Sequence, residues 1–379
     1  MAGMSAAYNL IGQVDRVLIC EKETPAHTGS SSYGDTRMYR EMYSDPWLAQ
    51  VARQTSRLWT ALETRAGKPL RAAHGLLFYG EDWGEETIEG SIQGAKKVME
   101  AQQIPFQEYD ARGMERDFPL HCEAHWTGLF EANAGAVLVE EVFDIWTSAI
   151  REAGFTLRNH TAVADVRDRE SSAEVVLGDG SVIEARKVIL TAGPWTRSFM
   201  PEPREELAFS VWHMLWGYYT IDPEYRNAFP QWFNFQHKQP DDPNQGLFYG
   251  FPCLDQRPDG TPYVKIGIDW TSDELKHPMY REDISLDPPA DLLQIMDGFA
   301  EEYLQGIRDR FHAQLSPYTM SPDVQFCLDQ LSPNVSVFSH GSGQAFKFAP
   351  MIGACLAALA TEATPPIDLS PWRLERLVA

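Results

Sequence analysis

The chain has 379 residues, 44% of them hydrophobic, which is enough to bury a large core in one complex domain or two interleaved ones. Its formal net charge of -22 argues against nucleic acid or an anionic membrane as a partner, because both need clustered Lys and Arg. No apolar run reaches the roughly 18 residues that span a bilayer, and no secretory leader pattern opens the sequence, so we expect a cytoplasmic protein.

Cysteine usage points the same way. The five cysteines are scattered and form no CxxC pair: Cys20, Cys122, Cys253, Cys327 and Cys355. Such thiols are typical of a reducing compartment. His121, Cys122 and His125 have a spacing that suits metal ligands, but no further cluster completes the three or four ligands that zinc needs. We therefore expect surface polar residues there and no metal.

The chain opens partway through a dinucleotide-binding pattern. Gly3 and the residues after it match the last glycine of a GxGxxG fingerprint and the following helix, and the apolar strand 16–20 then leads to Glu21. In a Rossmann-type unit that acid accepts hydrogen bonds from the adenosine ribose. The first strand and two earlier glycines do not precede Gly3, so we expect an N-terminally truncated unit with half of its pyrophosphate cradle.

Helices and strands alternate through the middle of the chain. Helical patterns are expected at residues 46–64, 85–102 and 141–152. Strands are expected at residues 76–80, 126–130, 155–158, 163–167, 173–177, 182–185 and 187–190. The last of these strands runs into Ala192 and Gly193, whose small size lets backbone approach a ligand.

The end of the chain resembles its start, because glycines again lead into a helix. Residues 212–268 are rich in aromatic residues and read as an antiparallel sheet, residues 288–311 read as a helix, and a strand at 336–339 leads through Gly341 and Gly343 into a helix at 350–363. This predicts an α/β fold, as an α+β composite. A Rossmann-like nucleotide domain is expected from residues 1–72, 135–200 and 315–379, and an antiparallel-sheet substrate domain from residues 73–134 and 201–314.

Three runs of sequence carry a family resemblance. They are HTGSSSYGDTRMYR at residues 27–40, YTMSPD at 318–323 and GSGQAFKF at 341–348. In this order they resemble segments of the sarcosine oxidase and N-methyltryptophan oxidase family, and the similarity covers essentially the whole chain. The resemblance implies an FAD enzyme of the D-amino-acid oxidase superfamily, whose Rossmann-like domain binds the flavin.

The resemblance also implies a reaction and its partners. In that family a hydride passes from the carbon beside the amine nitrogen of a secondary or N-methylated amino acid to flavin N5, and water hydrolyses the resulting imine. The electrons then pass to O2, which leaves as hydrogen peroxide, while the protein supplies orientation and charge. We expect a small amine or amino-acid substrate, no nucleic-acid or membrane partner, and a monomer.

Catalytic and substrate-binding positions follow from the same resemblance. Lys265 matches the lysine that activates oxygen, Arg37 lies beside the flavin ring, and Tyr33 stands where these oxidases often carry a histidine. Arg40 and Lys347 are cations that could clamp an α-carboxylate. For Lys265 the alternative is a snorkelling edge lysine, and for the other two cations a surface ion pair.

Two tyrosines and an acid complete the expected substrate site. Tyr249 and Tyr318 are expected in an aromatic cage, with plain packing as the alternative. Asp269 stands where sarcosine oxidase has an active-site histidine, and a carboxylate there would favour a cationic amine or a hydroxylated group. The expected cofactor contacts are Gly3, Glu21, Ser32, Thr36, Ala192, Gly193, Ser316, Gly341, Gly343, Phe346 and Lys347.

Ser316 marks a departure from the family. It occupies the position of the cysteine that usually links covalently to the flavin, and a hydroxyl cannot readily form that thioether, so we expect non-covalent FAD. Trp212, Trp216 and Trp232 add aromatic surface, but the sequence does not show whether they reach the pocket. Two rival hypotheses stay open: a dehydrogenase of the same fold with another electron acceptor, and a flavin-free remnant or binding protein.

Overall fold

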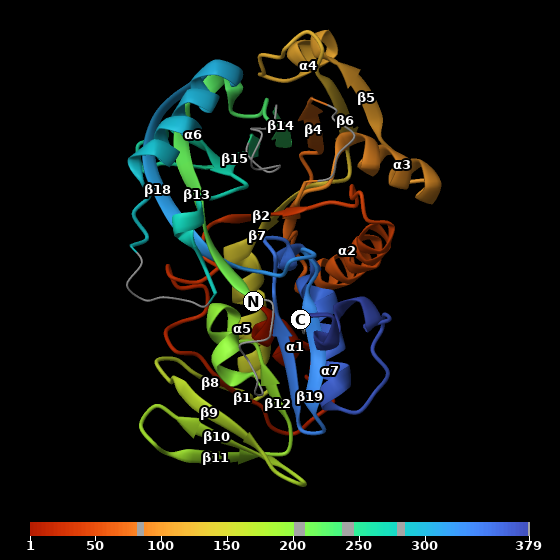
Figure 1. Cartoon of the computed structure of the whole chain (residues 1–379), viewed down its shortest axis with the longest axis vertical. Helices are drawn as coiled ribbons and strands as arrows, with labels where there is room; N and C mark the ends of the chain where they lie inside the picture. Colours follow the sequence, from red (N-terminus) through yellow and green to blue (C-terminus); the bar gives the residue numbers. More distant parts are fainter. Residues whose placement is uncertain (82–86, 201–208, 237–245, 279–284, 378–379) are drawn as a thin grey trace.

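A computed structural model describes residues 1–81, 87–200, 209–236, 246–278 and 285–377. The chain forms a lower part that carries the terminal helices and short parallel strands, and an upper part built around one large sheet (Figure 1). Segments far apart in the sequence meet in both parts. This confirms the mixed α/β class predicted from the alternating patterns.

Parallel pairing organises the lower part. β1 (Leu18–Cys20) pairs in parallel with β8 (Thr156–Arg158), and β12 (Val188–Leu190) pairs in parallel with β20 (Val335–Ser339). β19 (Cys327–Ser332) runs antiparallel to β20. Three helices pack on these strands: α1 (Ala2–Asn9), α5 (Val139–Glu152) and α7 (Ala349–Ala360).

The contact between α1 and α7 is unusually close. A Cβ added to Gly353 of α7 would lie 2.2 Å from Ser5 Oγ and 2.6 Å from the Ser5 carbonyl carbon. The Ser5 hydroxyl donates a 2.7 Å hydrogen bond to the carbonyl oxygen of Ala349. The missing side chain of Gly353 therefore lets the first and last helices of the chain touch backbone to backbone.

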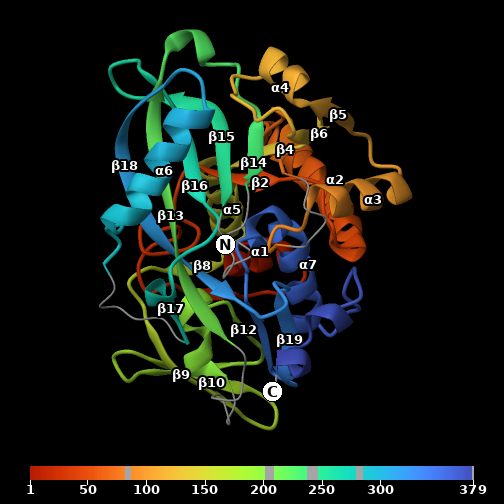
Figure 2. The same cartoon turned by 45° about the horizontal axis from the view of Figure 1, so that its top comes forward.

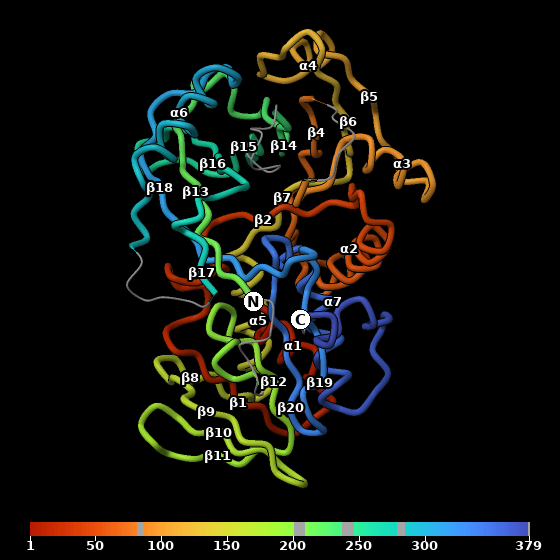
Figure 3. The backbone as a smooth tube through the Cα atoms, in the orientation of Figure 1, coloured from red at the N-terminus to blue at the C-terminus, as the bar shows by residue number. Residues whose placement is uncertain are grey.

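Smaller sheets join and flank the two parts. β2 (Thr36–Tyr39) pairs with β7 (Gly135–Leu138), which also pairs with β3 (Arg71–Ala72), between the upper and lower parts (Figure 3). β9 (Val163–Asp168), β10 (Ala173–Leu177) and β11 (Val182–Ala185) form an antiparallel sheet at the lower end. Between β2 and β3 runs α2 (Pro46–Ala66), which the Asp45 carboxylate caps and which ends at Gly67, φ 68.

The upper part holds a nine-stranded sheet. Its order is β17 (Lys276–His277), β13 (Ser210–Ile221), β16 (Pro262–Ile268), β15 (Leu247–Gln256), β14 (Gln231–Phe235), β4 (Leu76–Gly80), β6 (Thr127–Glu131) and β5 (Gln107–Asp110), and β18 (Ile307–Met320) pairs with β13. Helix α6 (Ala290–Tyr303) packs on β16 and β18, while α3 (Ile92–Gln102) and α4 (Ala111–Asp117) pack beside β6 (Figure 2). The antiparallel sheet expected within residues 212–268 is confirmed.

Three predicted helices are longer than the observed ones, and one of them, expected at residues 350–363, is α7, which ends at Ala360. The helix expected from residue 85 begins only at Ile92, because Ser91 accepts a hydrogen bond from the backbone of Gly94 and caps it. Residues 85 and 86 of that prediction lie outside the described residues. The helix expected to reach residue 311 ends at Tyr303, because Gly306 turns with φ 72 and the chain then enters β18.

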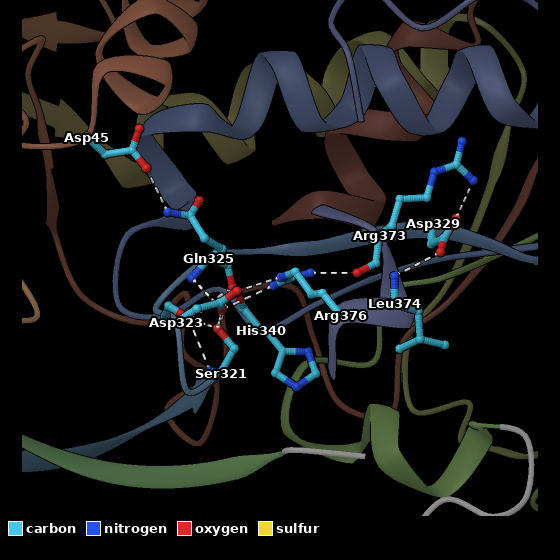
Figure 4. A network of polar contacts seen from close by, with 10 residues as sticks. Asp45, Ser321, Asp323, Gln325, Asp329, His340, Arg373, Leu374 and Arg376 are labelled. Carbon is cyan, nitrogen blue, oxygen red and sulfur yellow. Dashed lines mark hydrogen bonds and ion pairs between the residues drawn. The ribbon is translucent and has the colours of Figure 1, made fainter. Parts of the chain in front are cut away.

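The C-terminal segment is bound by ion pairs to the loop after β18 and to β19. Arg376 donates to Asp323 (Nε to Oδ2, 2.7 Å), and Arg373 donates to Asp329 (Nη1 to Oδ1, 3.0 Å). Gln325 donates to Oδ2 of Asp45, the residue that caps α2 (Figure 4). These contacts tie the end of the 318–323 motif to two distant parts of the chain.

Helices of the described residues are too short or too polar to cross a membrane.

Candidate active site

A cavity of about 610 Å³ opens between the large sheet and the segments on either side of β2. Eleven of the residues predicted for the site line it: Tyr33, Thr36, Arg37, Tyr249, Lys265, Asp269, Ser316, Tyr318, Gly343, Phe346 and Lys347. They come from five separate stretches of sequence. This volume includes space that is open to solvent.

Lys265 lies on β16, the strand between β13 and β15, and lines the cavity. Its ammonium lies 4.4 Å from the centre of the Trp216 ring and 5.4 Å from that of Phe251, which flank it from β13 and β15. The residue is only 7% exposed. Burial, and then the nearby Arg37 cation, lower the pKa of Lys265 well below its usual value. A snorkelling edge lysine would be exposed, so this geometry favours the functional alternative.

Arg37 is held in place by backbone oxygens. It donates to the carbonyls of Thr36 (2.7 Å), Ser31 (2.7 Å) and Tyr33 (2.5 Å), and its guanidinium faces the Phe346 ring at 5.8 Å. Carbonyl groups orient the cation without neutralising its charge. The cation is therefore available to stabilise negative charge that forms in the cavity.

Gly34 keeps the two cations accessible. It adopts φ 106, and an added Cβ would lie 3.5 Å from both Arg37 Nη1 and Lys265 Nζ. Few residues other than glycine tolerate this backbone conformation. The turn therefore passes beside both cationic groups without a side chain to fill the space between them.

Ser316 faces the cavity from β18. Its hydroxyl accepts a 2.9 Å hydrogen bond from the indole nitrogen of Trp216, on the adjacent strand β13. The Tyr33 ring lies 6.2 Å from the Trp216 ring. Trp216 thus reaches the pocket, while Trp212 and Trp232 do not line it. Ser316 remains the predicted site of non-covalent contact with the flavin.

Tyr249 and Tyr318 both line the cavity. The Tyr249 ring lies directly over Gly267, where an added Cβ would be 2.2 Å from its Cζ atom. Burial, and then the neighbouring Tyr318, raise the pKa of Tyr249 well above its usual value. Both phenols therefore stay neutral and present hydroxyl groups to a ligand.

Lys347 lies in the 3-10 turn Ala345–Phe348, just before α7. The turn is anchored by the Trp59 indole, which donates to the Lys347 carbonyl (2.8 Å). Burial, and next the Arg40 cation, lower the pKa of Lys347 to about 7. A lysine whose pKa lies near the pH of the solution is readily protonated when an anion binds beside it.

Arg40 is placed differently from the prediction. It forms a buried ion pair with Glu89 and lies among the rings of Tyr43, Phe78 and Phe233, at 4.5, 5.0 and 5.4 Å. Glu89 lines the large cavity whereas Arg40 does not. Arg40 is therefore already paired with a carboxylate of the protein, and its binding of a substrate carboxylate stays a prediction.

Asp269 follows β16 at the same end of the cavity. Glu89 lines the same cavity, and the Oδ2 atom of Asp269 is buried with no partner among the described residues. Burial, and then the charge of Glu89, raise the pKa of Asp269 well above its usual value. Asp269 therefore lies within electrostatic reach of the buried Arg40–Glu89 ion pair.

The remaining predicted cofactor residues lie outside the large cavity. Ala192 and Gly193 (φ 56) follow β12, Glu21 follows β1, and Gly3 packs its backbone against Thr191, where an added Cβ would be 2.7 Å from Oγ1. Ser32 is half-buried in the loop before β2. Gly341 donates its N–H to Thr319 Oγ1 (3.0 Å).

These positions fit an extended dinucleotide. The ends of β1 and β12 and the start of α1 supply an acid and small residues at the lower part, as a ribose and a pyrophosphate need. The cavity supplies aromatic walls and two cations, as a flavin ring that gains negative charge needs. Among the described residues, no cluster of His, Cys, Asp or Glu could hold a metal ion.

The sequence did not identify all the residues that line the cavity. The ones it missed are Met38, Glu89, Phe233, Phe251 and Gln344, whereas the sequence left Trp216 open. Phe251 was detectable, because it lies two residues after Tyr249 on one strand and shares its face. Glu89 had no such signal, since it comes from a turn between β4 and α3.

Known proteins resemble this chain along its whole length. A family model described as FAD dependent oxidoreductase matches residues 1–359. The N-methyl-L-tryptophan oxidase of Salmonella agona (strain SL483) is 26% identical over 381 residues, covering 99% of this chain and 96% of that protein.

Solved structures give the same result. The open form of NikD, described as an unusual amino acid oxidase essential for nikkomycin biosynthesis, has a TM-score of 0.86 and 25% identity, covering 98% of this chain and 94% of its own. L-proline dehydrogenase from P. horikoshii shares the fold, with a TM-score of 0.76, 17% identity, and coverage of 99% and 95%. Because the family model spans nearly the whole chain, the protein belongs to the family of FAD-dependent oxidoreductases.

Proposed function

We propose that this FAD enzyme oxidises a carbon–nitrogen bond of a secondary amino acid, N-methylated or otherwise substituted on nitrogen. The observation that carries the proposal is one cavity with two chemically different ends. Lys265 and Arg37 lie together beside Gly34, and Lys347, Asp269, Tyr249 and Tyr318 also line the cavity. An amino acid needs the same combination of a carboxylate site and a redox site.

The bound FAD would supply a hydride acceptor for the carbon next to the amine nitrogen. Lys347 would bind the substrate carboxylate as a point charge. The hydroxyls of Tyr249 and Tyr318 would hydrogen-bond to the substrate, and the surrounding aromatic rings would exclude water. Arg37, fixed by three backbone carbonyls, would stabilise negative charge at the redox end.

We propose O2 as the electron acceptor. A buried lysine beside the redox end, flanked by Trp216 and Phe251, provides a positive charge where negatively charged oxygen species form. Lys265 is that residue. If the enzyme uses a different acceptor, Lys265→Met would change turnover under air and turnover with an artificial acceptor by the same factor.

The relative from Salmonella acts, by its name, on N-methyl-L-tryptophan. The cavity here is walled by several aromatic residues, including Trp216, Phe233 and Phe251. This supports an N-substituted amino acid with a bulky or aromatic side chain over a small one. We propose non-covalent FAD, because Ser316 holds the linkage position, and a monomer.

We also propose that the two predicted domains bind the cofactor and the substrate separately. Residues 1–72, 135–200 and 315–379 would bind FAD, and residues 73–134 and 201–314 would bind the substrate. The five cysteines are free thiols, three of them buried, which supports a reducing, cytoplasmic location.

The test is anaerobic reduction of the FAD-loaded protein. N-methyl-L-tryptophan, sarcosine, L-proline and L-pipecolate are added in turn, and loss of visible flavin absorption is followed. We expect at least one secondary amino acid to bleach the flavin, and air to restore the colour with release of hydrogen peroxide. Bleaching only by primary amino acids or hydroxy acids would contradict the proposal, and a protein that takes up no FAD would support the flavin-free hypothesis instead.

A further inference from the structure

Among the described residues that line the large cavity, only Met38 carries a sulfur atom. Met38 lies on β2, where alternate side chains point to the same face, and Thr36 on that face also lines the cavity. Met38 is 7% exposed. A molecule as small as hydrogen peroxide, once inside the cavity, therefore meets this residue in the wall.

The sulfur of Met38 already has a cationic hydrogen-bond donor beside it. Arg40 Nη1 donates to Met38 Sδ at 3.6 Å, and the Arg40 side chain is completely buried. A thioether sulfur is only a weak acceptor. A sulfoxide oxygen is a stronger one, and burying it without a donor would cost free energy. The guanidinium therefore favours an oxidised sulfur at this position over other buried methionines.

We propose that Met38 is a modification site, at which hydrogen peroxide formed in the cavity oxidises the thioether to a sulfoxide. The sulfur lone pair attacks one peroxide oxygen, the O–O bond breaks and the S–O bond forms. The sulfur loses two electrons, the peroxide gains them, and the proton of the transferred oxygen leaves with the departing hydroxide as water. The source of the peroxide rests on the proposed function.

The new oxygen would enter a closely packed wall. Met38 belongs to one core cluster with Phe233 and Tyr249, which also line the cavity. An extra atom in such packing forces its neighbours to shift, and the thioether becomes a polar group. Carboxylate ligands should then bind more weakly. Reductases reverse this oxidation, so peroxide from turnover would slow the enzyme reversibly.

The first test uses added peroxide and no substrate. The FAD-loaded protein is treated with hydrogen peroxide, digested, and analysed by mass spectrometry for methionines that have gained one oxygen. Met42 and Met99 are the internal references, because both are completely buried in the same core cluster and neither lines the cavity. We expect Met38 to be oxidised about tenfold faster than either reference.

The second test measures ligand binding before and after the same treatment. Calorimetry gives the dissociation constant of furan-2-carboxylate, a flat carboxylate that the enzyme does not oxidise at nitrogen. Peroxide should weaken binding to the unmodified protein about fivefold. Met38→Leu has no sulfur to oxidise at this position and nearly the same volume, so peroxide should leave its dissociation constant unchanged. Met42→Leu is the matched control and should respond like the unmodified protein.

The opposite results would overturn the inference. They are oxidation of Met42 or Met99 as fast as that of Met38, unchanged binding after Met38 is oxidised, or weakened binding in peroxide-treated Met38→Leu. Because peroxide is added, these results leave the proposed function standing, and its failure leaves the comparison of methionines valid. Turnover that releases peroxide but leaves Met38 unmodified would refute oxidation by the enzyme's own product.

Discussion

Raising the pH should weaken the binding of carboxylate ligands through Lys347. Burial and the Arg40 cation bring the pKa of this lysine down to about 7, so its ammonium loses its proton within the accessible pH range. Furan-2-carboxylate stays ionised throughout that range. The carboxylate ligand binds the charged form of Lys347, and the negative charge of the bound ligand raises the pKa of this lysine in the complex. Above pH 7 the free protein has lost the lysine proton, so the protein must take up a proton when the ligand binds.

The size of the effect follows from that linkage. Below pH 7 Lys347 is already charged and the dissociation constant should be nearly constant. Above pH 7 the charged fraction falls tenfold per unit, so affinity at pH 9 should be about a hundredfold lower than at pH 6. Two pKa units correspond to about 2.7 kcal/mol of binding free energy.

The assay is a titration of the FAD-loaded protein with furan-2-carboxylate at half-unit steps from pH 6 to pH 9. Lys347→Met should bind weakly with a dissociation constant that no longer changes with pH. Lys265→Met is the control, because Lys265 is the other lysine whose pKa is lowered in this cavity. A flat profile in the unmodified enzyme, or a slope that persists in Lys347→Met and disappears in Lys265→Met, would refute the assignment.

Three further predictions concern packing, stability and the flavin linkage. Gly353→Ala should lower stability by several degrees in thermal unfolding, because the new methyl collides with Ser5, whereas Gly298→Ala on the exposed face of α6 meets nothing within 4 Å and should stabilise by about 0.5–1 kcal/mol; equal effects would contradict the close contact of α1 and α7. Burial raises the pKa of Glu131 to about 7, so its folding stabilisation is present below the unfolded value of 4.5 and is lost as the pH rises through 7. Urea unfolding should show a loss of about 3 kcal/mol between pH 4.5 and 8 that Glu131→Gln lacks, and parallel profiles would disprove it. Acid precipitation should release FAD from the unmodified protein, whereas Ser316→Cys should retain part of it in the pellet; retention by the unmodified protein would contradict non-covalent binding.

Local features of the fold could be predicted from the sequence because they depend on neighbouring residues. The helix expected at residues 46–64 is α2, which begins at Pro46 as predicted, after the Asp45 cap, and runs two residues further to Ala66 before Gly67 ends it. Strand β4 was predicted with its observed bounds, since a short apolar run ending in glycine specifies it. The resemblance of residues 27–40, 318–323 and 341–348 likewise pointed to residues that the fold brings around one cavity.

The contacts between distant segments were decided by the tertiary structure. Arg40 and Glu89 are 49 residues apart, and only the turn before α3 places the acid between the guanidinium and the cavity. Trp216 and Ser316 are 100 residues apart and meet because β13 pairs with β18. The sequence by itself thus determined the family, the cofactor and most of the cavity wall. The charge of the pocket, by contrast, depends on which buried acid faces which buried cation, and no local pattern encodes that pairing.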